Sequence, residues 1–211
     1  MDAEFFRAWL TEAGTVIEAQ RDHLTQLDAA IGDADHGINL ARGFSAIATA
    51  LDQTATPTPG SVLILAGSML ISKVGGASGP LYGMALRQAG KSLGDTAEAD
   101  LIALAASLEA ALAGVQKLGA AREGEKTMVD ALAPAVGALQ KAISDGADAT
   151  VALAAAAGAA AEGALATISM QALKGRASYL GPRSVGHEDP GAASTAIIMA
   201  ALRDVARQLV P

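Results

Sequence analysis

The sequence predicts an all-α fold, an up-and-down array of eight antiparallel helices. Its apolar mass comes mainly from Ala, Leu and Gly: 51% of residues are hydrophobic but only 3% aromatic. Residues typical of strands are too few for a large sheet, whereas small apolar residues suit closely packed helices. Apolar residues also recur at helical spacing between breaks rich in Gly, Pro and polar residues. The 211 residues suffice for one core and show no linker, so we expect a single domain over residues 1–211.

The eight helices are expected at residues 5–30, 38–51, 61–73, 81–91, 97–118, 127–143, 149–170 and 192–209. The first carries apolar residues at helical spacing from Phe5 to Leu27, and its carboxyl end delivers Asp28. Pro57 and Pro59 end the second helix before the third begins.

Local signals place the later boundaries. The third helix stops at the Gly-rich turn 74–80, and the fourth ends at the break 93–95. Thr96 is expected to cap the fifth helix, and Pro134 to kink the sixth. A break at 145–148 precedes the seventh.

Polar and glycine-rich residues are concentrated in four connections, 28–39, 74–80, 119–128 and 174–191. They follow the first, third, fifth and seventh predicted helices. In an up-and-down array, alternate connections lie at the same end. We therefore expect these four to meet and form a site, with blander connections at the other end.

The connection 28–39 contains Asp28, Asp33 and Asp35. Carboxylate oxygens are hard ligands that Mg²⁺ prefers, usually together with phosphate oxygens and water. Three carboxylates could serve two ions. An EF-hand is excluded because its position-twelve Glu falls on Phe44. The alternative is that Asp33 or Asp35 caps the second helix while the other acidic residues are solvated.

Neighbouring residues suggest an anionic ligand. His36 could contact a phosphate, act as a base or bind metal, and Asn39 could reach a phosphate or orient a ligand. The glycine-rich stretch 75–80 opens a helix, where backbone N–H groups can bind an anion; an ordinary turn is the alternative. Near-matches to a P-loop at 85–92 and 119–127 follow no strand, so that fold is excluded.

The stretch 174–191 has no helical period and is long for a connection within a compact domain, which is typical of functional loops. Lys174 and Arg176 could balance phosphate charge, and the stretch could form a lid over a nucleotide. A solvated connection is the alternative.

Composition excludes several functions. A formal charge of −7 disfavours binding to nucleic acid or anionic membranes, and the lack of Cys excludes disulfides and thiolate chemistry. The acidic N-terminus is unlike a signal peptide. The Ala-rich run 151–161 is too short to span a membrane. We expect a cytoplasmic protein with no nucleic-acid or membrane partner.

Several motifs together resemble the dihydroxyacetone kinase L subunit family, DhaL. They read GDADHGIN at 32–39, GGASGPLYG at 75–83, GEKTMVD at 124–130, and KGRASYLG at 174–181 continued by GHEDPG at 186–191. The resemblance covers essentially the whole chain, in order. One departure is Glu125, where the family usually has Asp, and this change keeps the charge.

The resemblance implies a barrel-like bundle with ADP or ATP at one end and two Mg²⁺ ions held by Asp28, Asp33 and Asp35. It also implies nucleotide contacts at positions distributed over all four connections. These positions are His36, Gly37, Ile38, Asn39, Ala77, Ser78, Gly119, Met128, Arg176, Asp189, Pro190 and Gly191.

The resemblance further implies that dihydroxyacetone is held on a His of a separate K subunit, to which the L subunit delivers a phosphoryl group. This sequence contains no K portion, so we expect a free-standing subunit of the phosphotransferase-system type, with its bound ADP rephosphorylated by a phosphohistidine protein. No residue is expected to act as a covalent nucleophile. Two alternatives remain: an ATP-dependent kinase subunit for another short ketose or sugar alcohol, and a non-catalytic nucleotide-binding regulator that docks a transcriptional regulator.

Overall fold

The computed structural model describes residues 1–209, which contain nine α-helices, two 3₁₀-helices and no strand beyond an isolated bridge between Asp2 and Glu98. The last two residues of the expected domain 1–211 lie outside this range. The all-α prediction is confirmed. The elements are α1 (Ala3–Ala19), α2 (Arg21–Ile31), α3 (His36–Gln53), α4 (Pro59–Lys73), α5 (Ser78–Leu93), α6 (Leu101–Gly119), α7 (Val129–Ser144), α8 (Ala149–Ala166), η1 (Thr167–Ser169), η2 (Arg176–Ser184) and α9 (Pro190–Leu209).

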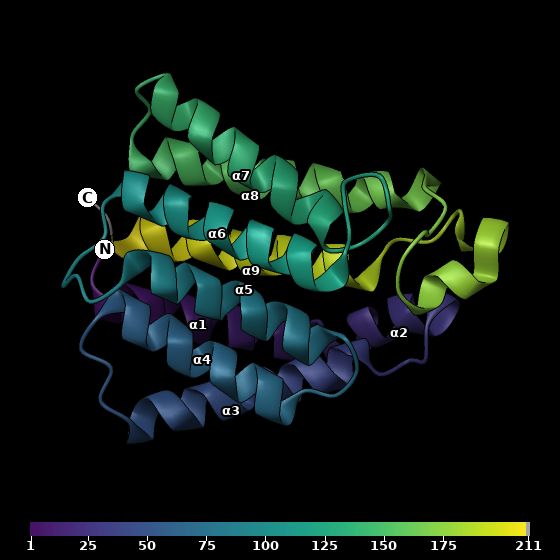
Figure 1. The fold of residues 1–211 in the computed structure, drawn as a ribbon, viewed down its shortest axis with the longest axis horizontal. Coiled ribbons are helices and arrows are strands. Elements are labelled where there is room, and N and C mark those ends of the chain that lie inside the picture. The colour runs from purple at the N-terminus through teal and green to yellow at the C-terminus, as the bar shows by residue number, and fades with distance from the viewer. Residues whose placement is uncertain (210–211) are drawn as a thin grey trace.

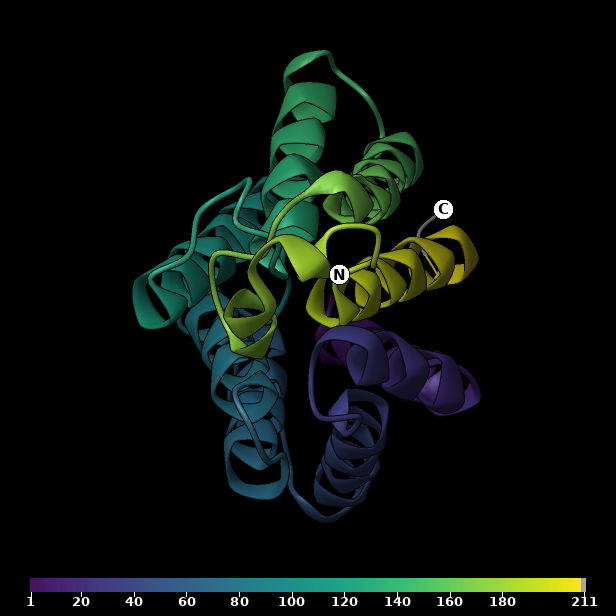
Figure 2. The same ribbon diagram turned by 90° about the vertical axis from the view of Figure 1, so that its right-hand side faces the viewer.

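The long helices lie side by side and form a ring around the core. Each of α3 to α9 packs against the next, and α9 returns to α1, which packs on α3 (Figures 1 and 2). The closing contact includes the indole N–H of Trp9, which donates to the carbonyl of Ile198 at 2.9 Å. The large fully buried side chains, among them Phe6, Leu63 and Leu139, fill the space that the ring encloses.

The prediction of one helix over 5–30, and with it the count of eight, is wrong. The chain leaves helical geometry at Gln20 (φ −97°, ψ 6°), so α1 and α2 are separate helices. The apolar spacing continues across the break, and neither Gly nor Pro marks it. The change of direction packs α2 on α3 and buries Leu24 and Asp28.

Other boundaries also differ from the prediction. Asp100, not Thr96, caps α6, because its side chain accepts from the N–H of Ala103 at 2.7 Å. Helix α7 continues through Pro134 without interruption. The stretch 174–191 is not irregular throughout, since it contains η2 with a non-helical residue at Gly181.

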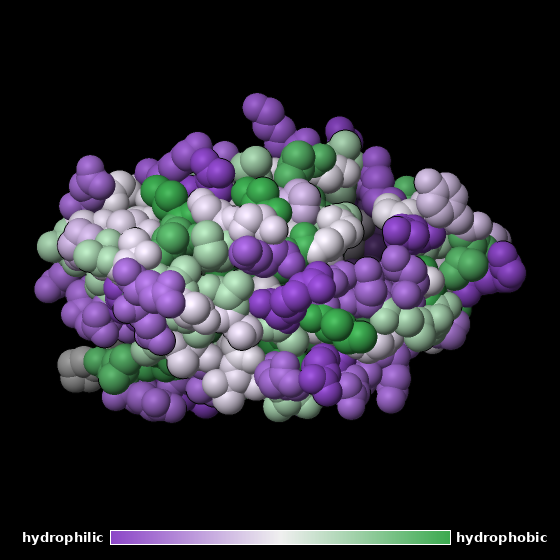
Figure 3. Space-filling model, turned by 90° about the horizontal axis from the view of Figure 1, so that it is seen from below, coloured by the Kyte–Doolittle hydropathy of each residue, from purple (hydrophilic) through white to green (hydrophobic). Residues whose placement is uncertain are grey.

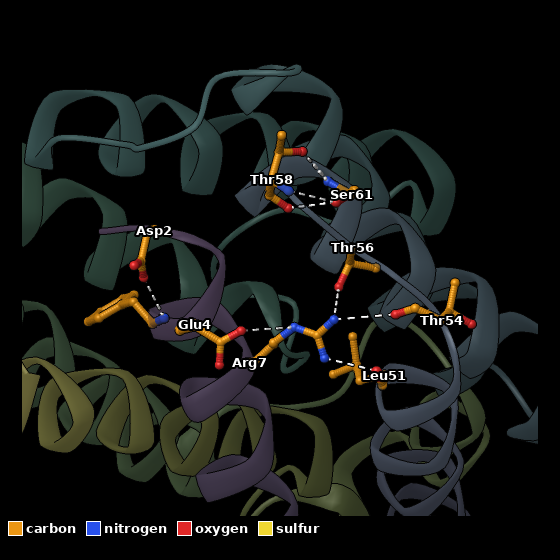
Figure 4. A network of polar contacts seen from close by, with 9 residues as sticks. Asp2, Glu4, Arg7, Leu51, Thr54, Thr56, Thr58 and Ser61 are labelled. Atoms are coloured by element: carbon orange, nitrogen blue, oxygen red, sulfur yellow. Dashed lines mark hydrogen bonds and ion pairs between the residues drawn. The ribbon is translucent and has the colours of Figure 1, made fainter.

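The end of the bundle near the N-terminus is held by ordinary structural contacts (Figure 4). The Arg7 guanidinium donates to the carbonyls of Leu51 (2.8 Å) and Thr54 (3.3 Å), which ties α1 to the α3–α4 connection. Thr58 and Ser61 form a reciprocal capping box at the start of α4.

Two segments, Leu101–Gly119 and Ala149–Ser169, are long and apolar enough to cross a membrane by length and composition alone. Both pack within the ring, α6 against α5 and α7, and α8 against α7 and α9. The molecular face in Figure 3 mixes hydrophilic and hydrophobic residues without a broad apolar band. These segments are therefore weak evidence for a membrane protein.

Candidate functional site

A cavity of about 280 Å³ lies at the end of the bundle where α2 and η2 are found. Figure 3 shows a hollow toward this end of the molecule. Residues from all four polar connections line the cavity. The expectation that alternate connections would meet at one end is therefore confirmed.

Most of the expected site residues line this cavity: Asp28, Asp33, Asp35, His36, Ala77, Ser78, Gly119, Met128, Arg176, Asp189, Pro190 and Gly191. Gly37, Ile38 and Asn39 do not. A Cβ on Gly37 would lie 2.0 Å from the carbonyl oxygen of Arg21, so this glycine lets α3 approach α2. Ile38 is exposed, and Asn39 Oδ1 accepts a 2.6 Å hydrogen bond from Arg42. Their expected nucleotide contacts remain predictions.

Asp28 joins α2 to the start of α3. Its Oδ2 accepts hydrogen bonds from the backbone N–H groups of Asp35 (2.8 Å) and His36 (3.1 Å), which otherwise have no partner at a helix N-terminus. The alternative that Asp33 or Asp35 caps this helix is not seen, because Asp35 occupies the N-cap without a side-chain hydrogen bond. The cap instead comes from Asp28, seven residues earlier.

Gly32 makes room for the Asp28 carboxylate. A Cβ at this position would lie 1.9 Å from Asp28 Oδ1. No side chain can be accommodated at that distance without moving the carboxylate.

The three carboxylates converge at the cavity. Asp28, Asp33 and Asp35 each offer an oxygen, and these oxygens all lie within 4.8 Å of one another. Asp28 is buried while Asp33 is exposed, so the cluster extends from the protein interior to solvent. Arg176 Nη2 lies 3.2 Å from Asp33 Oδ2. A set of hard oxygen donors open to solvent on one side fits Mg²⁺, which keeps water and phosphate ligands.

Four helices, α3, α5, α7 and α9, begin at this cavity. One residue at the start of each helix lines the cavity: His36, Ser78, Met128 and Pro190. Helix N-termini present unpaired N–H groups and the positive end of the helix dipole. The cavity therefore favours an anion beside the acidic cluster.

His36 connects three of these helices. Its Nδ1 is hydrogen-bonded to Ser78 Oγ (3.1 Å) and its Nε2 to Ser194 Oγ (2.8 Å). Burial lowers the pKa of His36, although the charges of Asp28 and Asp35 oppose this effect. A neutral imidazole with both nitrogens occupied is suited to holding α3, α5 and α9 together.

The sequence interpretation did not assign Tyr82, although this residue belongs to the glycine-rich motif at 75–83. Its buried hydroxyl is hydrogen-bonded to the Gly191 carbonyl (2.9 Å), Ser194 Oγ (2.7 Å) and Thr195 Oγ1 (2.8 Å). Burial raises the pKa of Tyr82, so the phenol stays protonated. Tyr82 therefore fixes the first turn of α9 against α5.

Lys126 and Thr127 also line the cavity and were not assigned, and Lys174, which was expected to balance phosphate charge, lies there too. Lys126 stands close to Asp189, the residue before α9, whose Oδ2 accepts from the N–H of Ala192 at 2.7 Å. Burial raises the pKa of Asp189 to about 7; nearby Asp130 adds to the shift, while Lys126 opposes it. The motif GEKTMVD was the available signal for Lys126, but no role for this lysine was predicted from it.

A comparison with protein families matches the DAK2 domain to residues 30–204 of this chain. The chain belongs to the DAK2 domain family. The resemblance drawn from the four motifs is confirmed. Curated relatives in this family include the PEP-dependent dihydroxyacetone kinase ADP-binding subunit DhaL of Escherichia coli, 42% identical over 95% of each chain. The PTS-dependent counterpart of Lactococcus lactis is 39% identical over 93% of this chain and 94% of that protein.

Longer members of the DAK2 family contain a similar segment. Human triokinase/FMN cyclase is 38% identical over 87% of this chain, which corresponds to 32% of that protein. The crystal structure of the dihydroxyacetone kinase of C. freundii matches with a TM-score of 0.74 and 28% identity, over 94% of this chain and 34% of the other. A second structure of that kinase, in complex with AMP-PNP and Mg²⁺, matches with a TM-score of 0.70.

Proposed function

We propose that this chain is the ADP-binding subunit of a PEP-dependent dihydroxyacetone kinase and forms a single domain over residues 1–211. The relatives that match nearly end to end carry this name. The observation that carries the proposal is the cavity itself, where a three-carboxylate cluster lies beside four helix N-termini. This combination suits a metal-bound polyphosphate and is difficult to explain as a structural core.

Asp28, Asp33 and Asp35 would hold Mg²⁺, and we propose two ions. Bound there, the metal supplies positive charge that neutralises phosphate oxygens. The nucleotide would contact the twelve positions implied by the DhaL resemblance. Support for most of them comes from their place in the cavity lining.

The residues of this chain would mainly position the nucleotide and neutralise the charge of its phosphates. The N–H groups at the starts of α3, α5, α7 and α9 would face phosphate oxygens, and Arg176 would add a guanidinium from the start of η2. His36 is already hydrogen-bonded at both nitrogens, so we propose that, besides its implied nucleotide contact, its side chain holds the three helices together. We assign no covalent nucleophile to this chain.

Two partners follow from this assignment. A separate K subunit would hold dihydroxyacetone, and a phosphohistidine protein of the phosphotransferase system would rephosphorylate the bound ADP. We expect these encounters in the cytoplasm, without nucleic acid or membrane. A transcriptional regulator stays a prediction from the sequence.

The direct test combines the purified chain, Mg²⁺, a K subunit, the phosphohistidine donor and dihydroxyacetone. We expect glycerone phosphate to form. If partners shown to be active with another L subunit give no product with this chain, the proposal fails. Denaturing the purified chain should also release ADP, and Asp33→Ala should release much less.

A second candidate is an ATP-dependent kinase subunit for another short ketose. It is favoured by an L-erythrulose 1-kinase from Mycolicibacterium smegmatis that is 40% identical over 85% of this chain. Turnover with ATP alone and rapid exchange of bound ADP would support this candidate over the first.

A further inference from the structure

The side chain of Lys126 is among the largest that are fully buried, with 1% exposure. Its ammonium donates hydrogen bonds to the carbonyl oxygens of Thr167 (2.6 Å), Met170 (3.2 Å) and His187. An ammonium has three N–H donors, so these acceptors saturate it. None of the three is a carboxylate, so Lys126 is bound by backbone and not by an ion pair.

Those carbonyls lie at the base of the segment 171–185, which we call the lid and which contains η2. The chain enters the lid after Met170 and leaves it before His187. The two ends are joined by a hydrogen bond from the N–H of Gly186 to the Ile168 carbonyl (2.7 Å). The N–H of Asp189 also donates to Thr167 Oγ1 at 2.9 Å. Lys126 therefore lies where both ends of the lid meet the body of the bundle.

The backbone at residue 126 has a conformation that is strained for any residue with a side chain, which indicates that the lysine side chain has a structural role at this position. Lys126 has φ +59°, in the left-handed region that glycine adopts without strain. Burial of the ammonium lowers the pKa of Lys126, although Asp189 and Asp130 oppose the shift. The left-handed backbone and the buried charge both cost free energy, and hydrogen bonds from the side chain to three carbonyls offset this cost. Two of these carbonyls lie at the carboxyl ends of α8 and η1, where the helix dipole favours a cation.

The lid brings cations to the cavity. Arg176 begins η2 and its Nη2 reaches Asp33 Oδ2 at 3.2 Å, while Lys174 lines the cavity. The Arg176 side chain is 68% exposed. The lid backbone itself packs on α2 through Ala172 and Ala177 against Ile31. An exposed ion pair contributes little rigidity. The position of the guanidinium therefore depends on how firmly the lid backbone is fixed, both by this packing and by the contacts at its base.

We propose that Lys126 is a positioning residue that fixes the lid through the carbonyls of Thr167, Met170 and His187, and so holds Arg176 over the bound nucleotide. The proposal rests on the proposed function in that it takes the ligand of the cavity to be ADP. It assigns Lys126 to retention of the nucleotide, without direct contact between its ammonium and the phosphates.

The test measures the dissociation rate of a fluorescent ADP analogue, with Mg²⁺ present, from the full chain. Lys126→Met keeps the length of the side chain and removes its charge and donors. We expect release at least about tenfold faster, a change of about 1.4 kcal/mol in binding. Lys141→Met is the matched control, because Lys141 is an exposed lysine on α7 that bonds only Asp145, and its release rate should be unchanged.

The deciding comparison is a double-mutant cycle with Arg176→Ala. If Lys126 acts by placing Arg176, Lys126→Met should accelerate release in the native background and have little further effect in the Arg176→Ala background. Equal acceleration in both backgrounds overturns the proposal, because Lys126 would then support the cavity independently of Arg176. Unchanged release in Lys126→Met overturns it as well.

Hydrogen exchange of the ligand-free chain separates this proposal from the proposed function. Amides of the lid should exchange faster in Lys126→Met while those of α3 to α6 are unchanged; uniform acceleration, or none, contradicts the proposal. If the native chain binds no ADP, the proposed function fails, but the exchange result still decides the role of Lys126. Should Lys126→Met not fold, Ser184→Ala serves instead, because Ser184 Oγ accepts from the Ala172 N–H (2.9 Å) at the base of the lid. It should show the same dependence on Arg176.

Discussion

The carboxylate of Asp28 takes part in two arrangements. Its Oδ2 caps the start of α3 while its Oδ1 lies against Gly32, and one of its oxygens belongs to the cluster with Asp33 and Asp35. If this carboxylate holds the proposed metal, the cap fixes its direction before any ion binds. Preorganised ligands of this kind are sensitive to small displacements.

Substitution of Gly32 tests this arrangement. In Gly32→Ala the new Cβ must displace Asp28 Oδ1, and we expect Mg²⁺-dependent ADP affinity to fall about 10- to 100-fold by isothermal titration. Gly137→Ala is the control, since a Cβ there meets no atom within 4 Å and the position lies inside α7. This control should bind ADP normally and be more stable by about 0.5–1 kcal/mol. Normal affinity in Gly32→Ala would contradict the assignment of Asp28.

The raised pKa of Asp189 predicts a pH dependence of stability. Because burial raises the folded-state pKa to about 7 from an ordinary 3.8, the folded state retains a proton that the unfolded state has lost between these values. This contribution is fully present below pH 3.8 and is lost as pH rises to about 7. Asp189→Asn removes it.

We therefore expect the difference in unfolding free energy, native minus Asp189→Asn, to decline across this window by an amount on the order of a few kcal/mol. Denaturant unfolding at several pH values measures it. A difference that is constant with pH, or that grows as pH rises, would show that Asp189 is ionised in the folded protein.

Some residues of the candidate site could be predicted from the sequence, and others could not. The cluster of Asp28, Asp33 and Asp35 was predictable because all three lie within one connection. Lys126 was not, because its acceptors come 41 to 61 residues later in the chain and are backbone carbonyls that carry no residue-type signal. Asp28 as the cap of α3 was missed because a cap is normally sought in the residue directly before the helix.

At the scale of elements, helix termini were predictable where a local signal exists. Pro57 and Pro59 located the connection before α4, although α4 begins at Pro59 and not at residue 61 as expected. The glycine-rich stretch located the connection before α5, which begins at Ser78 and not at residue 81. The break at Gln20 has no such signal, since it is imposed by the packing of α2 on α3. Helix η2 was missed because a 3₁₀ segment lacks the 3.6-residue period by which α-helices are recognised.

The capping box of α4 gives a prediction about one element. Thr58→Ala removes the acceptor for the Ser61 N–H (3.2 Å), and we expect a loss of about 1 kcal/mol in urea unfolding. ADP affinity should not change, because this box lies at the opposite end from the cavity. Thr49→Ala, an exposed position inside α3, should change stability by less than about 0.5 kcal/mol. Equal losses in both variants would argue against the capping box.

At the scale of the whole molecule, one end of the ring carries the candidate site and the other carries structural contacts such as those of Arg7. The alternation of polar and bland connections predicted this division, because an up-and-down array returns to the same end after every second helix. The number of helices was less predictable than the arrangement of their connections.

This division predicts how ligands change the stability of the entire chain. A ligand that binds only the folded protein at 100 times its Kd stabilises it by about 2.7 kcal/mol, and hence raises the Tm by roughly 5–10 °C for a chain of this size. We expect this shift with Mg²⁺ and ADP together in thermal denaturation. ADP with EDTA, and Asp33→Ala with both ligands, should shift the Tm little. A full shift with ADP and EDTA would rule out a metal-dependent site.

The closure of the ring by Trp9 and Ile198 has a consequence for the order of folding. These residues are 189 positions apart in the chain, so their contact forms only after nearly the whole polypeptide is available. Contacts of such long sequence separation form slowly. The cavity likewise draws residues from Asp28 through Gly191. During synthesis, the growing chain can therefore build most of its helices before it acquires any affinity for ligand, and docking of α9 is the step that creates the binding site.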